Sequence, residues 1–287
     1  MKKVVVALLF ISLVYIACLF SGCINIFSSS MKVDQVTEYN GHFTVGGSSA
    51  GMMVFKPLAD TFSSKYPGVT FEYRPGSKTS AALRQVNSES LDIAVYAREL
   101  KPEEKSSKLR FDMVFIDPIA IVVNKNLPVD SLSAQQVKDI YSGKVVNWSQ
   151  VGSIDAPIIV CDRSEDETSK IALRKFLLGN DLEITPHAVM LEKETDMINA
   201  VASTQYAIGY YSASKVESAG NSKMLKIDGA YPSVDNVRHG TYKIVRPIGV
   251  ATLYQNETLK EFIKFLYSKE AKEIVIKNGG VPIESKK

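Results

Sequence analysis

This sequence of 287 residues has few histidines and few cysteines, and its positive and negative charges nearly balance. The three histidines lie far apart, and none is paired with cysteine at the spacing that metal ligands need, so we expect no metal site. The acidic run 165–167 does not match the spacing of a calcium loop. The net charge is only +3 and no basic run is interleaved with aromatic residues, so we expect no nucleic-acid partner.

The amino terminus reads as a targeting segment rather than as part of the fold. Lys2 and Lys3 form a short basic start, residues 4–20 are almost wholly apolar, and small residues follow at 21–22. This pattern predicts a signal peptide over residues 1–22. A membrane-spanning anchor is the alternative, although the apolar run is at the short end for a span of about 20 residues.

Residues 19–23, Leu-Phe-Ser-Gly-Cys, resemble a lipoprotein signal, in which the cysteine is acylated and becomes the first residue of the mature chain. Lipidation is therefore expected at Cys23, and residues 23–40 are expected to be a polar tether. Cys161 would then be the one remaining thiol, which excludes an internal disulfide in the mature chain. We expect it to be a small buried apolar residue at the end of a strand.

The rest of the chain has enough apolar residues, 45% overall, to bury a large core. Short apolar runs alternate with segments of helical periodicity, an order typical of a parallel sheet with crossover helices. We expect strands at 43–45, 69–73, 91–96, 158–161 and 207–211, and helices at 52–66, 79–87, 131–142, 168–178, from 256 and from 268.

Two longer apolar runs, 113–123 and 244–253, stand out from this alternation. We expect them to be strands that cross between two lobes. A ligand would then lie between the lobes, at loops that leave the carboxyl ends of strands.

Three strand-to-helix turns are rich in glycine or hydroxyl groups: 46–51, 76–80 and 163–169. A helix amino terminus offers free backbone N–H groups and a partial positive charge. Hydroxyl groups add donors without adding charge. Three such turns aimed at one point would form a site for an oxyanion.

The first turn also fits a different chemistry. Residues 47–51, Gly-Ser-Ser-Ala-Gly, match the nucleophile elbow of serine hydrolases, with Ser49 as the nucleophile. His187 and His239 follow later in the chain, with many acids before each. The elbow would, however, fall on the first strand of the domain, which leaves no earlier sheet to hold an oxyanion loop. The hydrolase therefore remains the enzyme alternative to a binding protein.

The order of these segments resembles a known family, the solute-binding proteins of ABC importers, and within it the phosphate-binding branch. The likeness extends over nearly all of residues 42–282, and is carried by the stretches 46–73, 90–100, 131–163, 205–216 and 225–250. It implies an α/β fold of the type II periplasmic-binding-protein kind, with two lobes and two crossover strands. Each lobe would be a mainly parallel sheet with helices on both faces. The lobes would close on a ligand without catalysis and without a cofactor.

The resemblance also implies site residues. Ser48 and Ser49 fall on the first hydroxyl turn, Ser77 and Thr79 on the second, and Arg163 on the arginine that grips the anion.

Other expected contacts are replaced. Where the family has a Ser-Gly-Thr turn, this chain has Glu167, Thr168 and Ser169. The family's Asp or Ser after the third strand falls near Tyr96 and Ala97.

Acids surround Arg163 in the stretch CDRSEDETSK, residues 161–170. Ser164 and Glu167 fit a capping box, with Glu165 and Asp166 in the first helical turn, an arrangement that needs no ligand. The alternative is that Arg163 binds anion oxygens bidentately while Glu167 accepts the proton that phosphate carries and sulfate lacks.

The sequence therefore predicts a lipid-anchored binding protein on the outer face of the cytoplasmic membrane that captures phosphate or a related oxyanion for an ABC permease. We expect a monomer. A sensor, or a binding protein for another small ligand, is the alternative within the binding class. The lobe boundaries are expected at 41–117 plus 246–287 for the first lobe and 118–245 for the second.

Overall fold

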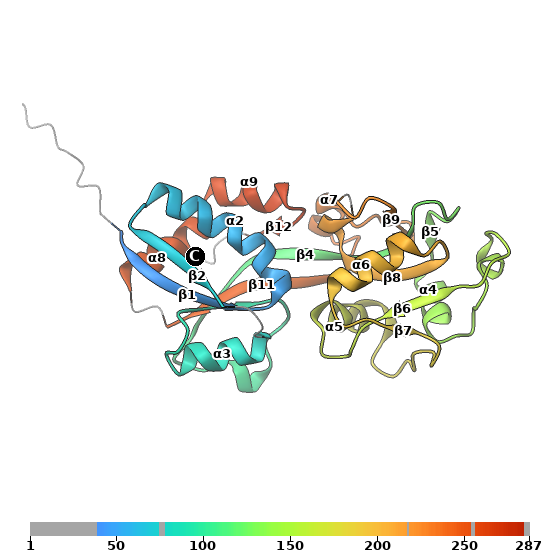
Figure 1. Ribbon diagram of the computed structural model, residues 1–287, viewed down its shortest axis with the longest axis horizontal. Helices are drawn as coiled ribbons and strands as arrows, with labels where there is room; N and C mark the ends of the chain where they lie inside the picture. The colour runs from blue at the N-terminus through green and yellow to red at the C-terminus, as the bar shows by residue number, and fades with distance from the viewer. Residues whose placement is uncertain (1–38, 75–77, 217, 254–255, 284–287) are drawn as a thin grey trace, which may run out of the picture. The chain divides into compact units, whose positions relative to one another are not determined.

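The computed structural model describes residues 39–74, 78–216, 218–253 and 256–283, and these residues form two lobes joined by a pair of long strands (Figure 1). Cys23 and Ser77, two of the residues singled out in the sequence, lie outside the described residues.

In the first lobe, α2, α8 and α9 cover one face of a parallel three-stranded arrangement and α3 covers the other (Figure 1). A cluster of phenylalanines, including Phe55, Phe62 and Phe262, packs under the three helices. The elements are β1 (Gly41–Gly47), α2 (Ser49–Lys65), β2 (Val69–Tyr73), α3 (Thr79–Asn87), β3 (Ile93–Tyr96), α8 (Glu257–Leu266), α9 (Lys269–Lys277) and β12 (Val281–Pro282).

Two strands cross from lobe to lobe, as the long apolar runs predicted. β4 (Arg110–Asn124) pairs antiparallel with β11 (Val245–Thr252), in a register that runs from Arg110 opposite Thr252 to Pro118 opposite Val245. β4 then continues into the second lobe, where it pairs with β8. The ten-stranded sheet therefore extends through both lobes. Eight of its strands follow the order β2-β1-β3-β11-β4-β8-β6-β7, and the other two, β12 and β9, both pair with β4. This confirms the α/β fold class and the crossover strands.

The second lobe has its own core, in which Trp148 is fully buried and donates its indole N–H to the carbonyl of Tyr206 at 3.1 Å. Its elements are β5 (Ser131–Leu132), α4 (Ala134–Tyr141), β6 (Ile159–Asp162), α5 (Thr168–Leu173), β7 (Val189–Met190), α6 (Glu194–Ser203), β8 (Ala207–Ser212), β9 (Ser222–Met224), β10 (Lys226–Ile227) and α7 (Val234–Arg238).

Three helices differ from their predicted bounds. The helix expected at 52–66 begins at Ser49, directly after its N-cap residue Ser48. The helix expected at 131–142 begins at Ala134, because residues 131–132 pair with β10 and Ser133 takes the N-cap, with Gln136 closing a capping box. The helix expected at 168–178 is α-helical only to Leu173, and residues 174–178 form a π-helical turn.

The strands β1, β3 and β6 all end where their lobe faces the other lobe, so the turns that follow them meet across one space. The first of these turns depends on a glycine. Gly47 has φ of +130°, and a Cβ there would lie 2.1 Å from the carbonyl oxygen of Val95 in the neighbouring strand.

We expect Gly47→Ala to lower the free energy of unfolding by at least about 3 kcal/mol, because backbone strain and a backbone clash add together. Gly152→Ala is the matched control: its φ is +83°, but a Cβ there would meet nothing within 4 Å. That control should lose only about 1 kcal/mol. Urea unfolding of both variants measures the difference, and equal losses would contradict the close-packing argument.

Candidate functional site

A cleft of about 710 Å³ lies between the lobes. Both lobes line it. The first lobe contributes Gly47, Ser48, Ser49, Lys78, Thr79, Ser80, Arg98 and Lys101, and the second contributes Arg163, Glu165, Asp166, Glu167, Thr168, Ile171, Glu192, Lys193 and Glu194.

The wall on the first lobe is built from the starts of two helices. Ser48 is the N-cap of α2, and its backbone N–H donates to the carbonyl of Val95 at 2.9 Å while its hydroxyl makes no capping bond. Thr79 is the first residue of α3. Its hydroxyl is buried and has no hydrogen-bond partner among the described residues. Because an unpaired buried hydroxyl costs about 1–3 kcal/mol, Thr79 marks a place where a ligand oxygen would be stabilising.

Arg163 forms the facing wall and is turned inward, with only 5% of its surface exposed. One guanidinium nitrogen, Nη2, lies 2.8 Å from the carbonyl of Glu192 and 2.8 Å from Glu167 Oε2. Nη1 donates to the hydroxyl of Ser169 at 3.4 Å. Nε is buried and has no partner among the described residues. Nε is therefore the guanidinium nitrogen without a partner among the described residues, and the bidentate grip expected from the sequence stays a prediction.

A buried ion pair lies directly beneath Arg163. Lys170 is fully buried and its ammonium group lies 2.7 and 2.6 Å from the two oxygens of Asp162. Tyr210 donates its hydroxyl to Asp162 at 2.8 Å and accepts the backbone N–H of Arg163 at 3.1 Å. Burial, with the neighbouring Asp162 charge, raises the pKa of Tyr210, so the hydroxyl stays protonated. This series of hydrogen bonds, from Lys170 through Asp162 and Tyr210, therefore fixes the backbone of Arg163.

The acids after Arg163 do not form the capping box that the sequence suggested. The helix begins at Thr168 with Glu167 as its N-cap residue, and Ser164 bonds to Asp166 instead of to the helix. Residues 164–167 form a turn, because the N–H of Glu167 donates to the carbonyl of Ser164 at 3.0 Å. Glu165 and Asp166 therefore precede the helix rather than occupy its first turn.

Each of these acids instead has a cation of its own. Glu165 pairs with Arg174 at 2.6 Å, Asp166 with Lys78 at 2.6 Å, and Glu167 with Arg163. The cationic partners lower the pKa values of Glu165 and Asp166, in each case chiefly through the hydrogen bond.

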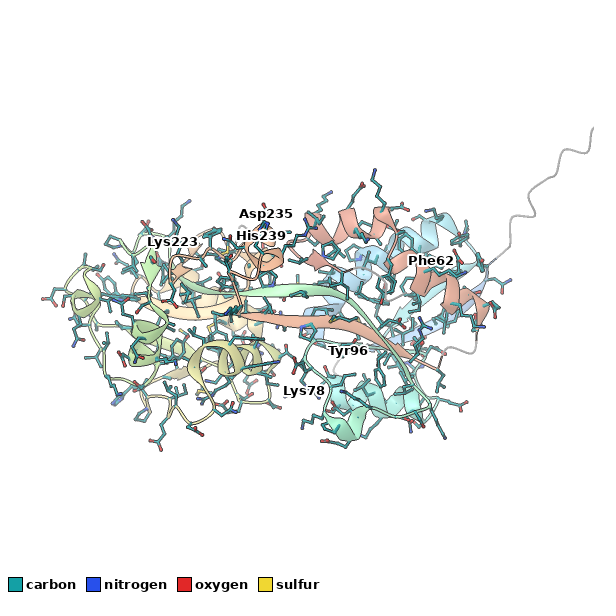
Figure 2. The ribbon with its side chains drawn as sticks, turned by 180° about the vertical axis from the view of Figure 1, so that it is seen from behind. Phe62, Lys78, Tyr96, Lys223, Asp235 and His239 are labelled. Carbon is teal, nitrogen blue, oxygen red and sulfur yellow. The ribbon has the colours of Figure 1, made fainter. Side chains whose placement is uncertain are left out.

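Two of the ion pairs join the lobes. Lys78, which Figure 2 shows on the side of the α3-bearing lobe that faces the second lobe, bonds to Asp166 and lies 3.5 Å from Glu167. Lys175 of the second lobe bonds to Glu99 of the first. All of the side chains in the Lys78–Asp166 and Lys175–Glu99 pairs are largely exposed.

Arg98 also lines the cleft, but its charge is already matched. Its two terminal nitrogens each lie 2.7 Å from an oxygen of Glu104, and one of them also donates to Ser80. The hydrogen bonds from Arg98, with a further one from Ser80, hold the pKa of Glu104 at about 2. Arg98 is thus a poorer candidate for an anion than Arg163.

The structure brings together most of the residues that the sequence singled out. Ser48, Ser49, Thr79, Arg163, Glu167 and Thr168 all line the cleft. Ser169 does not line it; it is fully buried and accepts a hydrogen bond from Arg163. Tyr96 and Ala97 are buried and are not among the lining residues.

The sequence reasoning missed Glu192, Lys193 and Glu194. Burial would raise the pKa of Glu194, but the charges of Arg246 and Lys215 lower it to about 2. No local motif signals these residues, because the partners of Glu194 lie in distant segments.

Histidine chemistry is absent from the cleft. None of the three histidines is among the residues that line it, and the ring of His42 lies within hydrogen-bond distance of Thr70 and Glu72 instead. Ser49, the proposed hydrolase nucleophile, therefore has no histidine base there.

Within the part of the chain that the structure describes, no group of three or more His, Cys, Asp or Glu side chains could hold a metal ion. Over those same residues, no helix combines the length and the hydropathy needed to cross a membrane.

A family model described as a PBP superfamily domain matches residues 33–270. The phosphate-binding protein PstS of Bacillus subtilis is 27% identical over 266 residues, which covers 91% of this chain and 86% of that protein.

Solved structures agree in fold. A phosphate ABC transporter substrate-binding protein from Clostridium perfringens, solved with bound phosphate, has a TM-score of 0.77 and 29% identity, covering 85% of this chain and 100% of that one. An ABC-type phosphate transport receptor from Vibrio cholerae has a TM-score of 0.68 and 26% identity, with coverage of 85% and 100%.

Proposed function

Because the chain belongs to the PBP superfamily, we propose that it is an extracytoplasmic solute-binding protein that captures inorganic phosphate and delivers it to an ABC-type importer. Three similar proteins support this: the Bacillus protein is named as phosphate-binding, the Clostridium structure holds phosphate, and the Vibrio protein is described as a phosphate transport receptor. The chain is a binding protein and not an enzyme.

One observation about the cleft carries the proposal. Two buried donors without partners among the described residues, the Thr79 hydroxyl of the first lobe and Nε of Arg163 in the second, belong to residues that line the same cleft. An oxyanion accepts hydrogen bonds at every oxygen, so a single phosphate would satisfy donors from both lobes at once. The backbone N–H groups at the starts of α2 and α3 favour the same negative charge.

Binding would then be coupled to the arrangement of the lobes. We place the lobe boundaries at residues 117–118 and 245–246, within the crossing strands, so that bending of β4 and β11 changes the width of the cleft. A ligand that contacts both walls stabilises the narrow arrangement, by an amount set by how much more tightly it binds the narrow arrangement than the wide one. Release needs only the reverse motion and the loss of these hydrogen bonds, and no covalent bond is made or broken.

Glu167 is the residue we propose for selecting phosphate. Its carboxylate lines the cleft, bonds to Arg163 and lies near Lys78, and as a carboxylate it can accept a hydrogen bond but not donate one. Near neutral pH phosphate carries a proton and sulfate does not. Glu167 would therefore accept a hydrogen bond from phosphate and repel sulfate.

We also propose that the chain is tethered to the outer face of the cytoplasmic membrane by lipid on Cys23, after removal of residues 1–22. The support is the sequence of residues 19–23, which resembles a lipoprotein signal. Capture on the outer face would place the ligand where a permease can receive it. We propose that a single copy is sufficient, because the cleft is lined by one chain.

Removal of either unpartnered donor should weaken phosphate binding. We expect Thr79→Val and Arg163→Lys each to raise the Kd for phosphate at least about tenfold, since each loses a hydrogen bond to a charged ligand. Isothermal titration calorimetry measures the effect. Thr241→Val is the matched control, because Thr241 is exposed, does not line the cleft and bonds to the carbonyl of Asn236. Unchanged affinity in both folded cleft variants would refute the assigned site.

Glu167→Gln should lower the preference for phosphate over sulfate by about tenfold or more, because an amide can donate to sulfate. The ratio of the Kd values for phosphate and sulfate is the informative quantity, because loss of the Glu167–Arg163 ion pair would strengthen the binding of both anions alike. Glu165→Gln is the control: it lines the same cleft but pairs with Arg174. A preference that survives Glu167→Gln would show that selection lies elsewhere.

Cys23→Ser should abolish acylation and release the protein from the membrane fraction, because the hydroxyl cannot replace the thiol in the modification. Cell fractionation and the mass of the mature chain measure both effects. Cys18→Ser, which alters the apolar segment and leaves Cys23 in place, should stay membrane-bound and acylated. Membrane retention of an unprocessed Cys23→Ser chain would instead favour a spanning anchor.

A further inference from the structure

A buried arginine, separate from Arg163, lies on a crossing strand and contacts Thr168, which lines the cleft. Arg246 lies on β11 and is 2% exposed. Its Nε donates to Asp117 of β4 at 2.8 Å, and Nη2 lies 2.7 Å from the same oxygen. Its remaining nitrogen, Nη1, donates to the hydroxyl oxygen of Thr168 at 2.9 Å. One side chain therefore links both crossing strands to the first residue of α5.

The position of Arg246 is fixed by further contacts. Ser212 of β8 donates its hydroxyl to the other oxygen of Asp117 at 2.6 Å. Glu194 lies 3.5 Å from Nη2 of Arg246 and is itself held by Lys215 and by the backbone N–H of Ser212. The guanidinium thus has carboxylates on two sides and a fork geometry that a lysine cannot reproduce.

The bond to Thr168 determines what that hydroxyl can do. A guanidinium only donates, so Thr168 must accept from Arg246 through an oxygen lone pair. The hydroxyl hydrogen of Thr168 is then left for a different acceptor, and none is found among the described residues. Thr168 lines the cleft, where a bound anion would supply that acceptor.

We propose that Arg246 is a positioning residue for ligand binding: it fixes the Thr168 hydroxyl as a donor toward the anion in the cleft. The inference rests on the proposed function, because the ligand assumed is inorganic phosphate. Arg246 acts through the direction of one hydrogen bond and not through its charge, since Asp117 and Glu194 oppose that charge at short range. A substitution that keeps the charge but loses the fork should therefore still weaken binding.

A double-mutant cycle tests this role. Calorimetry would measure the Kd for inorganic phosphate in the wild type, Thr168→Val, Arg246→Lys and the double variant, with Thr168→Ser as the conservative variant. We expect each of the first two substitutions to raise Kd about tenfold, and Thr168→Ser to bind within about threefold of wild type. The Kd of the double variant should be at most about threefold higher than the Kd of Thr168→Val alone.

A Kd that rises about a hundredfold in the double variant, the product of independent losses, would overturn the proposal. So would an unchanged Kd in Arg246→Lys, or equal losses in Thr168→Ser and Thr168→Val. If thermal melting shows that Arg246→Lys does not fold, Asp117→Asn takes its place, because it weakens the anchor and keeps the guanidinium. Its loss should likewise disappear when combined with Thr168→Val, and persistence of that loss would overturn the proposal.

The wild type separates this inference from the function on which it rests. A wild-type protein that does not bind phosphate overturns the proposed function, and the positioning role falls with it. A wild-type protein that binds phosphate but shows additive losses overturns the positioning role alone.

Discussion

The antiparallel pairing of β4 with β11 is the constraint on which the rest of the structure depends. Here the chain passes between two separate hydrophobic cores, and the pairing joins the strands of both lobes into one sheet. Because the starts of α2 and α3 and the turn after β6 all face the space beside this crossing, donors distant in sequence share one cleft. A site built in this way is complete only when both lobes contribute.

The acidic side chains at 165–167 in the cleft are neutralised by ion pairs with basic side chains. Of the acids at 165–167, only Glu167 pairs with Arg163. Glu165 pairs with Arg174, and Asp166 pairs with Lys78, which also lies near Glu167. The buried Lys170 and Asp162 are hydrogen-bonded to each other, and Tyr210 donates a further hydrogen bond to Asp162; such pairing is the condition under which buried ions are tolerated. Arg163 can therefore bind a local acid and a ligand at the same time. Its Nη2 pairs with Glu167, and its Nε has no partner among the described residues.

Much of this arrangement was predictable from local patterns. Strand, turn and helix periodicity located the first two hydroxyl turns and Arg163, and the long apolar runs identified the crossing strands, because these signals lie within a few residues of each other. The capping box was wrong because Ser164 and Glu167 have the same spacing in a simple turn as at a helix start. Arg246 was hidden within an apolar run, since its partner Asp117 lies 129 residues away. No one-dimensional spacing encodes such a contact.

The exposed ion pairs Lys78–Asp166 and Lys175–Glu99 join the two lobes. Attraction between exposed charges weakens as dissolved ions accumulate, with a screening length of about 8 Å at physiological ionic strength and about 3 Å in molar salt. The strength of these two contacts between the lobes therefore depends on the ionic strength of the surrounding solution, and it falls as salt is added.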